Sequence, residues 1–185
     1  VLDGDHWVLN GTKIFITNSA TPMTLGSTVQ VVSGEKNGKP EFTTFLMEND
    51  TPGFTQEPMN RKMMWRASNT GRLTFNNVEL TNDNMLGAPG QGSHIMLATL
   101  DGGRLSIAAM ALGCAQGAYE MALAYSKERE QFGKQICKFQ AVSFKLADMA
   151  MKIEAARCLL YKACRIKDAG MPFGKEAAMA KLYCS

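Results

Sequence analysis

The second half of the chain carries apolar residues at alternating steps of three and four positions. Such spacing places every member on one seam of an α-helix and predicts long helices that pack at shallow angles, as in an up-down bundle. Gly133 separates two such stretches, and Gly170-Met171-Pro172 ends the second. A third helix is expected to start near Phe173 and to continue to Ser185, which suggests a piece of a longer bundle. The seams are Leu105, Ala108, Leu112, Ala115, Tyr119 and Ala122, then Phe139, Val142, Leu146, Met149, Ile153, Ala156, Leu160 and Ala163.

The first half has short β-rich runs in place of helical spacing. Val29–Val32 and Phe42–Met47 flank the turn-like segment GEKNGKP, and Leu73–Leu80 alternates well enough to be another strand. Asn10-Gly11, between two apolar runs, predicts a further hairpin because both residues tolerate the positive φ of a tight turn. Segment 59–70 fits no strand template and is expected to be a loop with a bend. Regular short strands predict a small antiparallel β-barrel or sandwich.

A run of breakers, MLGAPGQG at 85–92, separates the two patterns and predicts the domain boundary. The expected fold class is α+β and multidomain. Residues 1–88 would form a β-domain, and residues 89–185 the first helices of an α-bundle domain.

Charge and cysteine content exclude several classes of protein. Residues 1–88 carry seven Lys/Arg and nine Asp/Glu, and residues 89–185 carry thirteen and eight, for a total of +3. The positive excess of the second half fits an anionic small ligand but is too diffuse to predict nucleic-acid binding. No uninterrupted apolar run approaches the ~18 residues of a membrane-spanning helix, so no membrane is expected as a partner. Five cysteines without a CxxC pair favour a reducing compartment over a disulfide framework and argue against zinc.

The segment FITN at 15–18 offers a surface for a planar ring. Because successive side chains of a strand point to opposite faces, Phe15 and Thr17 are expected to share a face. An aromatic wall beside a hydroxyl suits a planar heterocycle. The alternative is an ordinary hairpin with Phe15 in the core.

Asp101, Gly102, Gly103 and Arg104 lie where the first long helix should form. Each glycine costs a helix about 1 kcal/mol relative to Ala, which suggests close approach of a ligand or a neighbouring backbone. Arg104 supplies a permanent cation that Asp101 can orient. The alternative is a helix-capping Asp beside an exposed Arg.

Arg129, Phe132 and Gln140 frame the connection between the two long helices. An Arg and a Gln on either side of an aromatic ring could grip a pyrophosphate and stack on a purine. The alternative is a charged loop anchored by Phe132.

Taken in this order, the segments resemble the acyl-CoA dehydrogenase family of flavoenzymes, and within it the short-chain, butyryl-CoA branch, over essentially the whole chain. NGTKIFITN resembles the family's flavin-contacting strand, although the family more often has Trp at position 15, and Arg66, Ser68 and Thr70 match its R-x-S-x-T run. LDGGRLSIAAMALGCAQGA and REQFG…FQAVSFKLADMA resemble the starts of its C-terminal helices, and PFGKEAAMAK resembles the short-chain form.

This resemblance implies FAD-dependent α,β-dehydrogenation of a short-chain acyl-CoA to the trans-2-enoyl-CoA, with electrons passed to an electron-transferring flavoprotein. It also implies a homo-oligomer, usually a dimer of dimers, because some residues would reach the FAD of a neighbouring subunit. The location would be the bacterial cytoplasm, or the mitochondrial matrix in a eukaryote. The implied residues are Phe15, Ile16 and Thr17 on the flavin, Arg129, Phe132 and Gln140 on the neighbour's FAD, and Asp101, Gly102, Gly103 and Arg104 on the substrate.

The resemblance places the catalytic Glu past Ser185, so this piece alone is expected to be inactive. Some branches carry the base one residue before the helix Arg, where this chain has Gly103. Two alternatives stay open: a non-catalytic flavin- or CoA-binding interaction module, and a relative of the acyl-CoA oxidases that passes electrons to oxygen.

Overall fold

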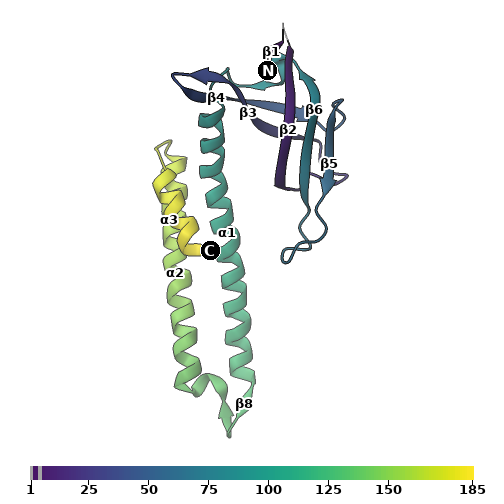
Figure 1. Ribbon diagram of the computed structural model, residues 1–185. Helices are drawn as coiled ribbons and strands as arrows, with labels where there is room; N and C mark the ends of the chain where they lie inside the picture. Colours follow the sequence, from purple (N-terminus) through teal and green to yellow (C-terminus); the bar gives the residue numbers. More distant parts are fainter. Residues whose placement is uncertain (1, 4–5) are drawn as a thin grey trace. The chain divides into compact units, whose positions relative to one another are not determined.

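The computed structural model describes residues 2–3 and 6–185, with Leu2 and Asp3 described by their backbone alone. The chain separates into two compact units, residues 1–97 and residues 98–185. The first unit thus includes the beginning of helix α1, and the boundary after residue 88 stays a prediction. The order of antiparallel sheets followed by helices confirms the expected fold class (Figure 1).

Two antiparallel sheets make up the first unit. The four-stranded sheet has the order β1-β2-β6-β5, and the three-stranded sheet has the order β3-β4-β7. The strands are β1 Leu2–Asp3, β2 His6–Thr17, β3 Gly26–Lys36, β4 Lys39–Glu48, β5 Phe54–Pro58, β6 Thr70–Leu80 and β7 Met85–Leu86, with a short 3-10 helix η1 at Asn82–Asn84.

The core of this unit lies between its sheets and consists of large apolar side chains. The ring of Trp7 on β2 lies 5.3 Å from that of Phe45 on β4, measured between centroids. Phe54 and Phe75 stack at 5.2 Å. The remaining buried members are Leu9, Val29, Met47, Leu73, Val78 and Leu80.

The hairpin predicted at Asn10-Gly11 is wrong, because β2 continues through both residues. Pairing passes from Leu9↔Val78 to Gly11↔Phe75, so β6 carries an extra residue there. Asn77, in this bulge, has a φ of 50°. The side chain of Asn10 accepts from the Asn77 N–H at 2.8 Å and donates to Asn77 Oδ1 at 2.9 Å. The Asn-Gly pair therefore accommodates a bulge between paired strands, an irregularity that local turn propensity cannot distinguish from a hairpin.

Other strand predictions are confirmed. β3 and β4 form the expected hairpin, and its turn residues Asn37 and Gly38 have φ values of 54° and 73°. β6 contains the strand predicted at Leu73–Leu80, and residues 59–69 form a loop with turns.

The helical unit also follows the predicted seams. Helix α1 spans Gly92–Glu128, α2 spans Gln140–Asp168 and α3 spans Gly174–Cys184, and a small hairpin of β8 Glu130–Gln131 and β9 Lys134–Gln135, with the 3-10 helix η2 at Ile136–Lys138, joins the first two. Helix α2 ends in a Schellman motif: Gly170, with a φ of 69°, donates to Lys167 O, and Met171 donates to Ile166 O. The buried core is Leu105, Ala108, Leu112, Ile153, Ala156, Leu160, Ala163, Ala177 and Ala180.

Helix α1 is long and apolar enough to cross a membrane by length and composition alone, with a mean hydropathy of 1.4 over its most apolar window. Its sequence contains no uninterrupted apolar run of that length, because glycine, polar and charged residues such as Asp101, Arg104 and Gln116 interrupt it. Within the second unit, Leu105, Ala108 and Leu112 of α1 are buried in the core shared with α2 and α3. Of the residues in its most apolar window, 17% are buried in the described chain.

Candidate functional site

The end of β2 departs from regular strand geometry at Phe15. Pairing passes from Lys13↔Leu73 to Ile16↔Gly71, so β2 carries the extra residue, and Phe15 takes it up with a φ of 63°. Its side chain is 68% exposed, which removes the alternative that Phe15 belongs to the core. Ile16 packs against the core, and Thr17 is exposed. The exposed Phe15 ring and the exposed Thr17 hydroxyl thus lie on either side of Ile16, which packs against the core.

The turn after β2 is closely packed. Ser19 is 2% exposed, and its hydroxyl donates to Ile16 O at 2.9 Å. A Cβ added at Gly71, the strand partner of Ile16, would lie 2.3 Å from Ser19 Oγ. Glycine is required at position 71 so that this turn can lie against β6.

These residue types fit an isoalloxazine ring. Phe15 offers a flat apolar surface, and the Thr17 hydroxyl makes no hydrogen bond within the part of the chain that the structure describes, so it can serve a polar ring edge. The side chain of Ile16 is directed to the core, so its contact with such a ring would be made by its main chain.

Asp101 and Arg104 form an ion pair on α1, with 2.5 Å between Oδ1 and Nη1. Their side chains are 28% and 41% exposed. Asp101 also lines a cavity of about 390 Å³ with Ala98 and the 170–174 segment. A Cβ at Gly102 or Gly103 would meet no atom within 4 Å, so no residue that the structure describes requires glycine there. The space remains open to a ligand.

Phe132 lies at the tip of the hairpin that joins α1 to α2. Phe132 and Gly133 have φ values of 53° and 76°, the geometry of a tight two-residue turn. The Phe132 ring is 92% exposed and lies 6.2 Å from the ring of Phe139. Arg129 and Gln140, at either end of the connection, are exposed. An exposed ring with an Arg and an amide nearby fits the adenine and pyrophosphate portions of a dinucleotide.

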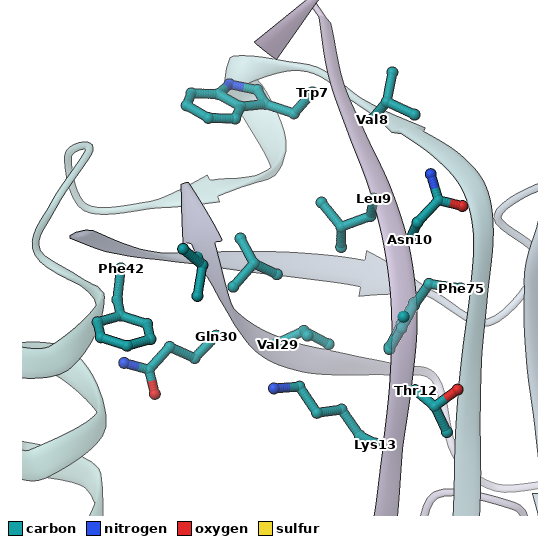
Figure 2. A pocket seen from close by; sticks show the side chains of 13 residues that line it. Trp7, Val8, Leu9, Asn10, Thr12, Lys13, Val29, Gln30, Phe42 and Phe75 are labelled. Atoms are coloured by element: carbon teal, nitrogen blue, oxygen red, sulfur yellow. The ribbon is translucent and has the colours of Figure 1, made fainter. Parts of the chain in front are cut away.

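A separate cavity of about 300 Å³ lies between β2 and β3 (Figure 2). Residues 7–13 of β2 and 29–32 of β3 line it, together with Phe42 and Phe75. β3 is one of the two edge strands of its sheet. Lys13 is the one charged residue among the lining, and none of the residues expected to bind flavin or substrate lies there. The cavity is therefore separate from the residues expected to bind flavin and substrate.

Sequence reasoning missed two residues that support these sites. Gly174 begins α3 beside Asp101, and a Cβ there would lie 2.8 Å from Asp101 Oδ2. Asn69, inside the R-x-S-x-T run, makes hydrogen bonds to the turn after β2. The glycine at a helix start and the amide within a motif were visible signals, but their partners lie far away in sequence.

Two glutamates of the helical unit, Glu120 and Glu154, make local contacts. Glu120 accepts from Gln116 at 2.6 Å, and Glu154 pairs with Arg157 at 3.2 Å. Hydrogen bonding of the Arg157 guanidinium, as donor, to Tyr161 and then to Glu154 raises the pKa of Arg157. No group of three His, Cys, Asp or Glu residues in the described chain could hold a metal ion.

Comparisons with known proteins connect these features. Residues 1–78 match the family described as "Acyl-CoA dehydrogenase, middle domain", and residues 90–185 match "Acyl-CoA dehydrogenase, C-terminal domain". The chain therefore belongs to the acyl-CoA dehydrogenase family, which comprises FAD-dependent oxidoreductases.

Individual relatives are similar over the whole chain. A probable acyl-CoA dehydrogenase of Bacillus subtilis is 47% identical over 100% of this chain and 48% of its own length, and a short-chain specific acyl-CoA dehydrogenase of Megasphaera elsdenii is 47% identical over 99% and 47%. The solved structure of butyryl-CoA dehydrogenase from Megasphaera elsdenii matches with a TM-score of 0.92 at 46% identity, covering 98% of this chain and 47% of that one. The chain spans about half the length of the curated relatives it matches.

Proposed function

We propose that this chain supplies the β-domain and first bundle helices of an FAD-dependent acyl-CoA dehydrogenase that acts on a short-chain acyl-CoA. The observation that carries the proposal is the exposed Phe15 ring and free Thr17 hydroxyl, held at a left-handed bulge, in a chain 47% identical to a short-chain specific relative. Non-glycine residues held in left-handed backbone geometry, as Phe15 is, cluster at functional sites.

When bound, FAD would supply the acceptor for the hydride that leaves the β-carbon of the acyl thioester. Phe15 would hold one face of the ring and exclude water from it, and the Thr17 hydroxyl would donate to a ring-edge acceptor. Arg129 and Gln140 would bind the pyrophosphate and adenine of a neighbouring subunit's cofactor, with Phe132 beside them. The same contacts support assembly into a dimer of dimers.

Asp101 and Arg104 would orient the CoA thioester in the open space beside Gly102 and Gly103. Arg104 supplies donors to acceptors on the pantetheine chain, and Asp101 accepts from its amides while fixing the guanidinium. The α-proton would go to a Glu outside these 185 residues, so the chain alone is expected to be inactive. We further propose the bacterial cytoplasm, or the mitochondrial matrix in a eukaryote, as its location.

An electron-transferring flavoprotein is the proposed acceptor of the electrons. A structure named for the electron transferring flavoprotein of Acidaminococcus fermentans and flavin-based electron bifurcation matches with a TM-score of 0.91 at 45% identity, over 99% of this chain and 48% of that one. A prolyl acyl carrier protein oxidase also matches, with a TM-score of 0.92 but at 33% identity, so the higher identity of the first neighbour favours a flavoprotein acceptor over oxygen.

An anaerobic visible spectrum of the full-length gene product, before and after addition of butyryl-CoA, tests the function. Bleaching of the flavin bands is expected. Yellow protein that bleaches with longer chains alone would shift the substrate class, and protein that cannot be loaded with FAD would contradict the proposal in favour of a binding module.

The substrate residues have a test of their own. Arg104→Met should raise the KM for butyryl-CoA about tenfold, in line with the loss of one charge-assisted hydrogen bond. Lys127→Met, an exposed cation later on the same helix, is the matched control and should leave KM unchanged. An unchanged KM in Arg104→Met would remove Arg104 from the substrate site.

A further inference from the structure

Asn69, the last residue before β6, makes hydrogen bonds to the turn that follows β2. Asn69 Oδ1 accepts from the Ala20 N–H at 3.1 Å, and Nδ2 donates to Ala20 O at 3.0 Å. Its main-chain oxygen accepts from the Asn18 N–H at 3.0 Å. One side-chain amide thus pairs with both main-chain groups of Ala20, as a strand partner would, and fixes the turn relative to β6.

Lys62 in turn holds the loop that carries Asn69. Its half-buried ammonium donates to Thr70 Oγ1 at 2.7 Å and to the main-chain oxygen of Ser68. The Lys62 oxygen accepts from Arg66 Nε at 3.0 Å. Arg66, Ser68 and Thr70 of the R-x-S-x-T run therefore all contribute contacts that fix the loop on either side of Asn69.

The backbone at the end of β2 contains two nearby non-glycine residues in the left-handed conformation. Phe15 has a φ of 63° and Asn18 a φ of 56°. Each such residue costs on the order of 1–3 kcal/mol and persists only where the surroundings determine it. Ser19, through its bond to Ile16, supplies a restraint from within the turn. Asn69 supplies the restraint from the loop that precedes β6.

We propose that Asn69, supported by Lys62, is a positioning residue that sets the orientation of the Phe15–Thr17 surface toward a bound planar cofactor. The proposal rests on the proposed function, because only a ligand on that surface would sense its orientation. It assigns the R-x-S-x-T run a local role in holding the strand end, in place of direct contact with ligand.

The test uses the full-length gene product with Asn69→Ala and Asn69→Asp. The control is Asn60→Ala, because Asn60 lies in the same loop, is exposed and makes no side-chain hydrogen bond to any residue that the structure describes. Three quantities are measured: the affinity for FAD, the wavelength of the bound flavin's visible absorption, and the hydrogen exchange rate of the Ala20 amide.

Asn69→Ala should weaken FAD binding about tenfold, the equivalent of one or two hydrogen bonds, and shift the flavin absorption. The Ala20 amide should exchange faster because it loses its acceptor. Asn69→Asp keeps that acceptor and should recover part of the FAD affinity, and Asn60→Ala should match the wild type. Lys62→Met should change FAD affinity, flavin absorption and Ala20 exchange in the same directions as Asn69→Ala, but by smaller amounts. This variant provides the test if Asn69→Ala fails to fold.

Wild-type FAD affinity and an unshifted spectrum in Asn69→Ala, with faster exchange at Ala20, would overturn the positioning role and leave the proposed function intact. Unchanged exchange at Ala20 would overturn it as well. Wild-type protein that binds no FAD would overturn both proposals together.

Discussion

The two units of the chain place their candidate sites on opposite kinds of backbone. In the β-unit, the exposed Phe15 lies at a bulge with left-handed geometry. In the helical unit, Asp101 and Arg104 lie on a continuous helix, beside Gly102 and Gly103, where an added Cβ would meet no described atom within 4 Å. The cores differ in the same sense: Phe45 and Met47 are fully buried in the first, whereas Ala108, Ala163, Ala177 and Ala180 are the fully buried residues of the second.

The two candidate sites therefore differ in how their local geometry is accounted for. Contacts within the β-unit account for one, whereas no contact within the described chain accounts for the glycines of the other. The irregular end of β2 has its reasons inside the unit, in Ser19, Gly71 and Asn69. Gly102 and Gly103 have no such reason within the described chain, and large side chains such as those of Met121 and Leu182 are 76% and 79% exposed. Substitutions should therefore act in opposite ways in the two units.

The largest effect is expected in the core of the β-unit. Phe45→Ala should lower the free energy of unfolding by about 3–5 kcal/mol, because it leaves a cavity beside Trp7. Urea unfolding measures it, followed by tryptophan fluorescence in a Trp65→Phe background so that the signal comes from Trp7. Leu46→Ala, at the neighbouring and 53% exposed position, is the control and should change little. A loss equally large for Leu112→Ala, measured by circular dichroism of the helical unit, would break the contrast between the cores.

The next largest effect is expected at Gly71, where the turn after β2 lies close against β6. Gly71→Ala should destabilise the β-unit by about 1–3 kcal/mol, because the added Cβ would displace the buried Ser19 hydroxyl from Ile16. The same unfolding measurement applies. Gly34→Ala, where a Cβ would meet its nearest atom at 3.6 Å, is the control. A neutral result for Gly71→Ala would show that the turn after β2 can move away from β6, contrary to the packing described.

Much of the architecture follows from sequence because it depends on local periodicity. The seams of α1 and α2, the Asn37-Gly38 hairpin and β6 all repeat patterns that neighbouring residues supply. Asn10-Gly11 was misjudged because a bulge and a turn use the same residues, and pairing with β6 decides between them. Gly174 and Asn69 escaped notice for a related reason: Asp101 is 73 residues from Gly174 and Ala20 is 49 from Asn69. The assignments of Phe15 to the flavin and of Arg129 to a neighbouring subunit's cofactor stay predictions, because they came from resemblance.

Replacing an open glycine of α1 by alanine should change the stability in the opposite direction to Gly71→Ala. Gly113→Ala should stabilise the 185-residue chain by up to about 1 kcal/mol, because a Cβ there meets nothing and Ala has the higher helix propensity. Thermal unfolding followed by circular dichroism measures the change, with Gly71→Ala as the contrasting variant. Destabilisation in the full-length protein, against stabilisation here, would show that another segment approaches α1 closely. Destabilisation in both would contradict the open surface.

The smallest effect concerns Cys184, half-buried at the end of α3, whose Sγ lies 3.8 Å from Ala156 O. Burial raises the pKa of this thiol above its usual 9.0. The folded state thus favours the neutral thiol, so the stabilisation is complete below pH 9.0 and is lost as the pH rises from there through the folded pKa. Alkylation at pH 8 should accordingly be slower at Cys184 than at the exposed Cys114 and Cys158, with site-resolved mass spectrometry as the measurement. Cys184→Ser is the control for the slow phase. Equal alkylation rates at Cys184, Cys114 and Cys158 would mean that α3 separates from the core often enough to expose Cys184. The alanine-rich packing of this unit would then stabilise its last helix only weakly.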